Sequence, residues 1–498
     1  MKEPGITDAD LRVVVIGAGP AGLTAAYELM RNRVSSLILE KDPVVGGLAR
    51  TVRHQDYLFD IGGHRFYTKV SLVQKIWEEV LGGDFITRPR LSRIFYNGAF
   101  FQYPLSAIEA LKKLGVVESM RCMTSYLRAR LRPVRPEDDL ESWLRNRFGQ
   151  RLFEIFFKTY TEKVWGLSCR EIRADWAAQR IRGLSLSSLI RNTIAPARGR
   201  AKEIKTLIQE FQYPRKGPGM MWERMRDMLK NEGTQVVLNA PVHRICWRPG
   251  AVVSVETPEG SFACSHLISS MPIRELIQAL DPAPPQEVRD AAHDFRYRDF
   301  VTVALIVRSS DLFADNWIYI HDPGVKVGRI QNFGNWSPEM IPDPSTSCLG
   351  FEYFCQEGDE LWNSTDSDLV ALATRELAKL GLASPDRVAG GAVVRMPKAY
   401  PVYDAYYRRG LDVVKRFLSD VPNLQLIGRN GMHRYNNQDH SMLTGVFAAR
   451  NILGAHYDLW EASVDEEYFE EGRNVSEEEL RDLDHAQPKV PQIVKTES

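Results

Sequence analysis

Apolar positions near the start of the chain follow two successive patterns. The stretch RVVVI at residues 12–16 is almost wholly apolar, and after a glycine-rich turn the apolar residues recur every three to four positions. A second apolar run, SSLILE, covers residues 35–40. A short apolar run predicts a strand, and a spacing of three to four predicts a helix that packs on a core. Residues 12–40 therefore predict one βαβ unit.

The rest of the chain changes pattern several times. Residues 91–210 are rich in arginine, leucine and aromatic residues at helical spacing, which predicts a helical region. Short β-branched runs at 234–272 predict hairpins that return to the first unit, and longer apolar runs at 298–356 predict a separate sheet. Residues 424–453 predict a strand followed by a helix with the same apolar patterns as the βαβ unit.

Composition removes several classes of function. Lysine plus arginine and aspartate plus glutamate number 64 each, so no net charge draws the chain to nucleic acid. No run approaches the ~20 apolar residues of a transmembrane segment. The six cysteines show no metal-ligand spacing, which favours reduced thiols and no bound metal. We expect a soluble, cytoplasmic protein, and a homo-oligomer stays open.

A glycine motif lies in the turn of the βαβ unit. Gly17, Gly19 and Gly22 form G-x-G-x-x-G directly after a strand and at the start of a helix, and Glu40 ends the next strand. In dinucleotide-binding folds these glycines allow the turn, the approach of the pyrophosphate and the contact between helix and strand, while the acidic residue binds a ribose hydroxyl. We therefore expect a dinucleotide here, with its phosphates at the helix N-terminus.

A second glycine turn favours FAD over NAD. Gly46, Gly47 and Arg50 follow in EKDPVVGGLARTV and bring a cation suited to a pyrophosphate. The stretch resembles the fingerprint of glutathione-reductase-type FAD proteins, especially the amine oxidase, phytoene desaturase and protoporphyrinogen oxidase branch. The resemblance implies an α/β fold with a Rossmann-like FAD-binding domain. Val242, in the returning hairpins, is assigned to the same cofactor site.

The stretch GRNGMHRYNNQD, which begins at Gly428, is interpreted as the other end of the flavin site. It leads into a helix whose Met442, Val446 and Ala449 share one face. The positive end of that helix suits the N1 and C2=O edge of a reduced flavin. Arg429, Asn437 and Asp439 are expected at the cofactor. The alternative is a capped surface helix with Asp439 or Ser441 as N-cap.

Five patches, in the same order, resemble UDP-galactopyranose mutases. They are GGHRFYT at 62–68, TYTEKVWG at 159–166, VGRIQNF around Arg329, AYPVYD around Tyr400 and GRNGMHRYNNQD at 428–439. In that family reduced flavin attacks the anomeric carbon of a nucleotide sugar, and the net change is isomerisation between pyranose and furanose. The resemblance implies an FAD-dependent mutase for a UDP-hexose-like substrate. NAD(P)H could bind transiently as the reductant.

The resemblance also assigns the groups that hold the leaving diphosphate. Arg329 matches one family arginine, and Arg180 or Arg182 matches the other, since arginine binds phosphate through a bidentate fork. A solvated helix face explains Arg180 and Arg182 equally simply. Tyr400 and Tyr435 are expected to donate hydrogen bonds to phosphate oxygens, and Tyr435 is counted with the catalytic residues.

Three further residues are assigned in the same way. His64 matches a loop histidine beside the flavin N5 and C4 carbonyl, although a structural histidine is the commoner role. Tyr160 and Trp165 would frame the uridine and sugar-phosphate side of the cleft, although aromatic residues at helical spacing are often core. Asn437 falls where the family carries aspartate, so the choice of nucleotide and sugar stays open.

These patterns predict domains that are interleaved along the chain. Residues 8–90, 212–285 and 420–456 are assigned to the FAD-binding domain, 91–211 to an inserted helical region, 286–419 to a separate antiparallel substrate-binding sheet and 457–498 to an acidic, flexible tail.

Two other functions stay open. An FAD-dependent oxidase or desaturase of the amine oxidase or protoporphyrinogen oxidase type needs an apolar tunnel with aromatic walls, which residues such as Trp317 and Tyr353 could supply. A membrane-associated protein is the third hypothesis, because LRARLRPVR at 127–135 could contact anionic lipid. A solvated basic loop explains the same residues.

Overall fold

The computed structural model describes residues 12–461, except residues 69, 104, 106, 173, 175–209 and 405. Its first layer is a parallel sheet with the strand order β20-β13-β1-β2-β9. The strands are Leu424–Leu426 (β20), His266–Ser269 (β13), Val13–Ile16 (β1), Ser36–Leu39 (β2) and Gln235–Val237 (β9). All four residues of β1 are buried, as expected for the centre of a sheet that is covered on both faces.

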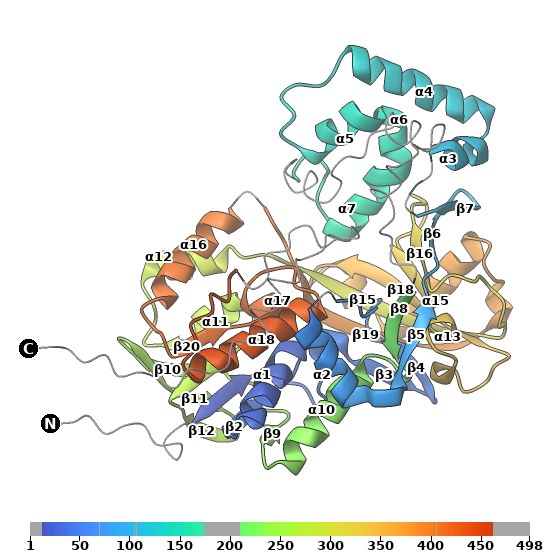
Figure 1. Cartoon of the computed structure of the whole chain (residues 1–498). Coiled ribbons are helices and arrows are strands. Elements are labelled where there is room, and N and C mark those ends of the chain that lie inside the picture. Colours follow the sequence, from blue (N-terminus) through green and yellow to red (C-terminus); the bar gives the residue numbers. More distant parts are fainter. Residues whose placement is uncertain are drawn as a thin grey trace, which may run out of the picture.

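Helices α1 and α18 come from opposite ends of the chain and lie side by side on this sheet (Figure 1). They span Pro20–Arg31 and Gln438–Ile452. Gly445 permits the close approach, because a Cβ there would lie 2.3 Å from the Ala21 carbonyl oxygen. The predicted apolar face of α18 is buried in the core, at Met442, Val446 and Ala449.

Smaller elements surround the parallel sheet. A four-stranded sheet consists of Gly260–Ala263 (β12), Ala251–Thr257 (β11), Arg244–Arg248 (β10) and Leu280–Asp281 (β14), and two ribbons pair Thr51–His54 (β3) with Tyr57–Asp60 (β4) and Phe85–Pro89 (β5) with Glu210–Pro214 (β8). The helices are Gly47–Ala49 (η2), Ser71–Leu81 (α2), Gly82–Asp84 (η3), Gly219–Asn231 (α10), Ile273–Ala279 (α11), Gln286–His293 (α12), Tyr407–Leu418 (α16) and Gly428–Gly431 (α17).

A seven-stranded sheet forms the second layer, in the order β19-β15-β18-β17-β16-β6-β7. Its strands are Val388–Pro401 (β19), Tyr297–Val307 (β15), Ser347–Cys355 (β18), Arg329–Asn332 (β17), Trp317–Ile320 (β16), Ser92–Tyr96 (β6) and Ala99–Gln102 (β7). The helices Phe333–Trp336 (α13), Pro338–Met340 (η5), Glu360–Asn363 (α14), Asp366–Lys379 (α15) and Pro385–Arg387 (η6) accompany it. The strand pairs within the predicted sheet at 286–419 are all antiparallel. β6, from the region predicted to be helical, joins β16 in parallel, so the whole sheet is mixed.

A helical region covers one end of the seven-stranded sheet (Figure 1). It contains Ala107–Leu114 (α3), Val116–Leu131 (α4), Leu140–Phe148 (α5), Gln150–Phe153 (α6), the π-helical turn Glu154–Lys158 (η4) and Thr159–Trp165 (α7). Helical character was predicted from residue 91, but the helices begin only at Ala107. The hairpin β6–β7 precedes them because Asn97 and Gly98 both adopt positive φ, the geometry of a two-residue hairpin turn.

Two helices within the predicted sheet domain belong to a different core. Val288 and Ala292 of α12 and Val414 and Leu418 of α16 are buried in the apolar cluster of the parallel sheet. The amphipathic faces of α12 and α16 therefore cover the first layer, whereas the strands between them build the second. The domain boundaries and the glutathione-reductase-type assignment remain predictions. Within residues 12–461, no helix that the structure describes is long and apolar enough to span a bilayer.

Candidate functional site

One cavity of about 1440 Å³ lies where the parallel sheet, the seven-stranded sheet and the helical region meet. At one end it is lined by the turn after β1 and by the turn after β2. The start of α18 lines its middle, and residues of α5, η4 and α7 line the other end. Residues that the sequence assigned to a cofactor and residues that it assigned to a substrate thus share one continuous space.

Each of the three glycines after β1 is needed for a different structural reason. Gly17 has a φ of 98°, and a Cβ on Gly22 would lie 1.9 Å from the Gly17 carbonyl oxygen, so both positions require glycine in the folded protein itself. Gly19 is the N-cap of α1 and lines the cavity, and the nearest atom to a Cβ there would be the Gly47 Cα at 3.8 Å. Gly19 therefore keeps open space at the start of α1, as a pyrophosphate requires.

Glu40 is held beside this turn by two backbone donors. Its carboxylate accepts hydrogen bonds from the Ala18 amide at 2.6 Å and from the Asp42 amide at 2.9 Å. Burial raises the pKa of Glu40, and the two amides oppose that shift. Arg50 forms an ion pair with Asp42 at 2.5 Å and still lines the cavity, as Val242 does.

The start of α18 faces the same cavity with unused polar groups. Asn437 is the N-cap of α18, and its side chain makes no capping hydrogen bond. The alternative caps predicted from the sequence, Asp439 and Ser441, lie inside the helix, which begins at Gln438. The Oδ2 atom of Asp439 and the Oε1 atom of Gln438 are buried without a hydrogen-bond partner. Such orphaned groups at a helix N-terminus fit a bound cofactor. Gly428, with a φ of 74°, lies beside them at the start of α17.

A partly buried arginine, Arg329 on β17, also lines the cavity. Antiparallel pairing of β17 with β18 places Arg329 opposite Glu352, and the Arg329 Nε donates to Glu352 Oε2. The other oxygen of Glu352 accepts from Gln331 Nε2 at 2.6 Å, and Arg329 Nη2 donates to the Tyr400 hydroxyl at 3.2 Å. Burial lowers the pKa of Arg329, but the Glu352 carboxylate and the neighbouring tyrosine hydroxyls together outweigh burial, so the net shift of the Arg329 pKa is upward.

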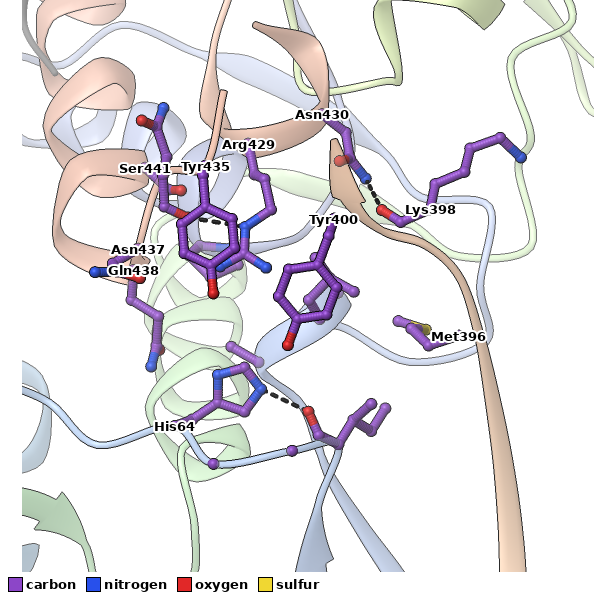
Figure 2. Close-up of a pocket in the computed structure, with 18 of the residues that line it drawn as sticks. His64, Met396, Lys398, Tyr400, Arg429, Asn430, Tyr435, Asn437, Gln438 and Ser441 are labelled. Carbon is purple, nitrogen blue, oxygen red and sulfur yellow. Dashed lines mark hydrogen bonds between the residues drawn. The ribbon is translucent and has the colours of Figure 1, made fainter. Parts of the chain in front are cut away.

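Two tyrosines and a second arginine adjoin Arg329. The rings of Tyr400 and Tyr435 stack at 5.5 Å with an interplanar angle of 13°, and their hydroxyl ends point the same way (Figure 2). The Arg429 guanidinium lies 5.5 Å from the Tyr400 ring centroid and 4.8 Å from that of Tyr435. Burial raises the pKa of Tyr400 to about 12, against the pull of Arg329. The Tyr400 hydroxyl therefore stays protonated and can donate.

His64 lies on the loop toward which these hydroxyls point (Figure 2). Its Nε2 lies 2.7 Å from the Ile61 carbonyl oxygen, which can only accept, so this nitrogen carries the proton. Burial lowers the pKa of His64 to about 4, so the imidazole is neutral at pH 7. The loop packs closely on β17, because a Cβ on Gly63 would lie 2.9 Å from Gln331 Nε2.

The far arm of the cavity is aromatic. Tyr160 stacks on His321 at 5.0 Å with an angle of 4°, and Tyr319 meets Tyr160 edge-on at 5.4 Å. Burial raises the pKa of Tyr160 well above its usual value. Trp165 lies with its ring 6.5 Å from that of Tyr435, at the junction with the tyrosine pair. Apolar residues of the helical region complete this arm: Leu140, Leu144, Phe148 and Phe156.

The structure thus brings together most of the residues that the sequence assigned to the site. His64, Tyr160, Trp165, Arg329, Tyr400 and Tyr435 all line the cavity, together with the cofactor residues Gly17, Gly19, Glu40, Gly47, Arg50, Val242, Gly428, Arg429, Asn437 and Asp439. Gly22 does not line the cavity, but it allows α1 to pack against the turn at Gly17. Arg180 and Arg182 lie outside the described residues.

Sequence reasoning missed several polar residues of the site, three of them on the side of the seven-stranded sheet. Gln331 and His321 line the cavity, and Glu352 lies behind Arg329. A signal existed for Glu352, because it is the one charged residue in the apolar strand SCLGFEYFC. Gln331 lies two positions after Arg329 and so on the same face of β17. His321 had no signal, because a histidine at the end of a strand is usually structural.

Buried histidines predict that acid destabilises the protein. Burial lowers the pKa of His64 and His433 to about 4 and that of His321 to about 3, from 6.5. Between pH 6.5 and 4 the unfolded chain therefore binds protons that the folded chain does not, and the free energy of unfolding falls as pH is lowered. Each of the two buried histidines, His321 and His433, contributes up to about 1.4 kcal/mol per pH unit, and the partly exposed His64 contributes less. Urea unfolding across this range measures the slope.

Two carboxyls act in the opposite direction, since burial raises the pKa of both Glu40 and Asp60. Burial raises the pKa of Asp60 to about 7, so the stability it contributes is present at low pH and is lost as pH rises toward 7. The three histidines outweigh these two carboxyls, so the net slope keeps its sign. His321→Phe is expected to make the slope shallower, and a slope that is unchanged in this variant or absent in the wild type would contradict the assignment.

Comparison with known proteins decides the family. The family model described as flavin containing amine oxidoreductase matches residues 20–453 of the chain. The chain belongs to the flavin-containing amine oxidoreductase family. Membership implies FAD as the cofactor, which agrees with the donor and acceptor groups at the glycine turns and at the start of α18.

A relative within this family is the putative flavin-containing monoamine oxidase AofH of Mycobacterium tuberculosis. It is 28% identical to the chain over 296 residues, which cover 56% of the chain and 61% of that protein. The first matches among curated relatives are shorter and cover as little as 26% of the other protein. The chain therefore matches only about a quarter to three fifths of the length of the curated relatives.

Two solved structures share the fold of this chain. Reduced UDP-galactopyranose mutase is 21% identical, with a TM-score of 0.79 that covers 91% of this chain and 98% of that one. A putative protoporphyrinogen oxidase from Exiguobacterium sp. 255-15 is 18% identical, with a TM-score of 0.68 and coverages of 90% and 98%. These likenesses establish a mixed α/β FAD-binding flavoprotein fold.

Proposed function

We propose that the chain is an FAD-dependent nucleotide-sugar mutase that isomerises a UDP-hexose-like substrate between pyranose and furanose forms. The observation that supports the proposal is the excess of positive over negative charge around Arg329. Two guanidinium groups, those of Arg329 and Arg429, face Tyr400, and Glu352 is the carboxylate beside them. Both oxygens of Glu352 are already bonded, and its side chain is fully buried. Such a site favours an anion over a cation.

A diphosphate suits the groups that surround this charge. Arg329 and the protonated Tyr400 hydroxyl can both donate to phosphate oxygens, and the hydroxyl of Tyr435 points the same way. His64 is neutral and adds no positive charge, so the positive charge near Tyr400 comes from Arg329 and Arg429. The aromatic arm around Tyr160 offers flat surfaces for a nucleobase. In this proposal the base lies in the aromatic arm and the diphosphate at Arg329, which leaves the sugar toward the flavin end.

FAD, when bound and reduced, supplies a nucleophilic nitrogen for the anomeric carbon. The chain's own residues hold the leaving diphosphate within the cavity, so that it can return after the sugar ring has opened. Because the diphosphate carries negative charge as it leaves, a fixed and preorganised guanidinium stabilises departure more than water does. Arg329 is preorganised by its bond to the buried Glu352. NAD(P)H could serve as the reductant.

An FAD-dependent oxidase or desaturase is the second candidate, favoured by the match to AofH. A cationic amine would need a carboxylate or an aromatic cage near the flavin. Ring centroids 5.5 Å apart are in direct contact, so no group fits between Tyr400 and Tyr435. The charge at Arg329 also opposes a cation. Both observations rank this candidate below the mutase.

Anaerobic incubation with a panel of nucleotide hexoses separates the two candidates. FAD-loaded protein, reduced with dithionite, is expected to convert one ring form into the other, whereas oxidised protein is not. Separation of the ring isomers measures the conversion and names the substrate. Oxygen consumption with amines, in the absence of any conversion by reduced protein, would replace the mutase with the oxidase.

A further inference from the structure

Helix α4 presents an apolar stripe to solvent. Val116, Val117, Met120, Leu127 and Leu131 are between 53% and 83% exposed, and they are five of the ten large apolar side chains exposed in the described residues. At 3.6 residues per turn they fall within an arc of about 100°. An isolated exposed apolar residue needs no explanation, but a continuous stripe on one helix indicates a surface that another body covers.

The opposite side of α4 already fulfils the structural role of the helix. Cys122 and Tyr126 are buried in a cluster with Leu140, Trp143 and Leu144 of α5. The helix therefore has two apolar faces, of which the inner one attaches it to the molecule. Nothing in the described part of the chain covers the outer one. Figure 1 shows α4 at the outer end of the helical region, remote from the parallel sheet.

Arginines border the stripe on both sides. Arg121 and Arg128 lie along one edge and Arg130 along the other, and Arg132 follows at the end of the helix. Arg121 pairs with Glu118 at 3.3 Å. The side chains of Arg128, Arg130 and Arg132 form no ion pair with any carboxylate among the described residues. They are therefore available to an anionic partner.

We propose that the outer face of α4 docks on a membrane surface that contains anionic lipids. The apolar stripe enters the boundary between headgroups and acyl chains, and the flanking arginines contact lipid phosphates. The helix has 16 residues and lies parallel to the surface rather than crossing it. This inference rests on α4 alone and is independent of the reaction in the cavity.

A second copy of the chain is the alternative occupant, and the charges disfavour it. A two-fold interface through α4 would bring its arginines against those of the partner or against Lys112 and Lys113 at the preceding helix end. Glu118, the acidic residue within α4, is already engaged by Arg121 and Arg151. Like charges at the rim would weaken such a dimer, whereas anionic headgroups complement them.

Vesicle sedimentation of the full, FAD-loaded chain tests the proposal. The chain is expected to pellet with vesicles of phosphatidylcholine and phosphatidylglycerol, much less with phosphatidylcholine alone, and less in high salt. The variant M120S/L127S/L131S is expected to lose at least tenfold in partition coefficient. The variant R128Q/R130Q/R132Q is expected to lose the preference for anionic vesicles and the salt dependence.

Matched controls separate docking from damage. Val253→Ser removes an exposed apolar side chain on β11 and is expected to bind vesicles like the wild type. Equal FAD content and equal circular dichroism show that each variant is folded. Absence of wild-type binding to anionic vesicles overturns the proposal. So does a wild-type dimer in sedimentation velocity that the stripe variant dissociates, if vesicles bind neither protein.

Discussion

Replacement of Arg329 by alanine is expected to lower the affinity for a nucleoside diphosphate by about a hundredfold while FAD stays bound. Arg329 makes charge-assisted hydrogen bonds worth roughly 1.5–3 kcal/mol each, and loss of about 3 kcal/mol corresponds to about a hundredfold in dissociation constant. The residues that line the glycine turns are unchanged by the substitution. Titration of UDP against the flavin absorbance measures the affinity, and the FAD content of the purified chain measures cofactor retention.

The same substitution leaves Glu352 buried without its cation. Glu352 is 0% exposed, and breaking a buried ion pair from one side costs about 3–5 kcal/mol. A loss of affinity in Arg329→Ala alone could therefore reflect partial unfolding. The double variant R329A/E352Q removes the charge while Gln331 keeps an acceptor. It is expected to recover most of the stability and none of the affinity. Wild-type affinity in the double variant would contradict the diphosphate site.

Gly19→Ala is expected to produce a folded protein that has lost at least tenfold in FAD affinity. The backbone of Gly19 has a φ of −82°, which alanine adopts freely, and the nearest atom to the new Cβ would be 3.8 Å away. The methyl group instead occupies the space that a pyrophosphate needs. FAD content after purification measures the loss of affinity, and the melting temperature of the cofactor-free protein measures whether the fold is retained.

Gly22→Ala is the matched contrast. Its Cβ would lie 1.9 Å from the Gly17 carbonyl oxygen, so the cofactor-free protein itself is expected to melt earlier. Normal FAD content in Gly19→Ala would mean that the pyrophosphate does not approach this turn. Loss of stability in Gly19→Ala equal to that in Gly22→Ala would mean that Gly19 is needed by the fold rather than by the ligand.

Local patterns in the sequence predicted several elements that line one end of the cavity. The turn after β1, Glu40 and the buried face of α18 each follow from a spacing of a few residues, and the structure brings them together. The hairpin at Asn97 and Gly98 was equally readable, since this pair between alternating runs is a strong hairpin signal. The aromatic and arginine-rich composition around it outweighed that signal, and the hairpin was assigned to the helices.

Long-range register explains what the sequence could not supply. Arg329 was assigned to the site through a family resemblance, but its partner Glu352 lies 23 positions away and becomes a neighbour only through the pairing of β17 with β18. The exposed stripe on α4 was likewise hidden. Its apolar spacing is that of a core-facing helix, and only the packing of Cys122 and Tyr126 shows that the stripe faces outward.

The pairing of α1 with α18 constrains how the protein is made. The first glycine turn leaves the ribosome early, but the wall that α18 supplies comes from Gln438–Ile452, almost at the end of the described chain. Until then β13 also lacks its neighbour β20, so an unpaired strand edge and an apolar helix face are exposed together. The wall of the cavity is therefore complete only after α18 has been synthesised.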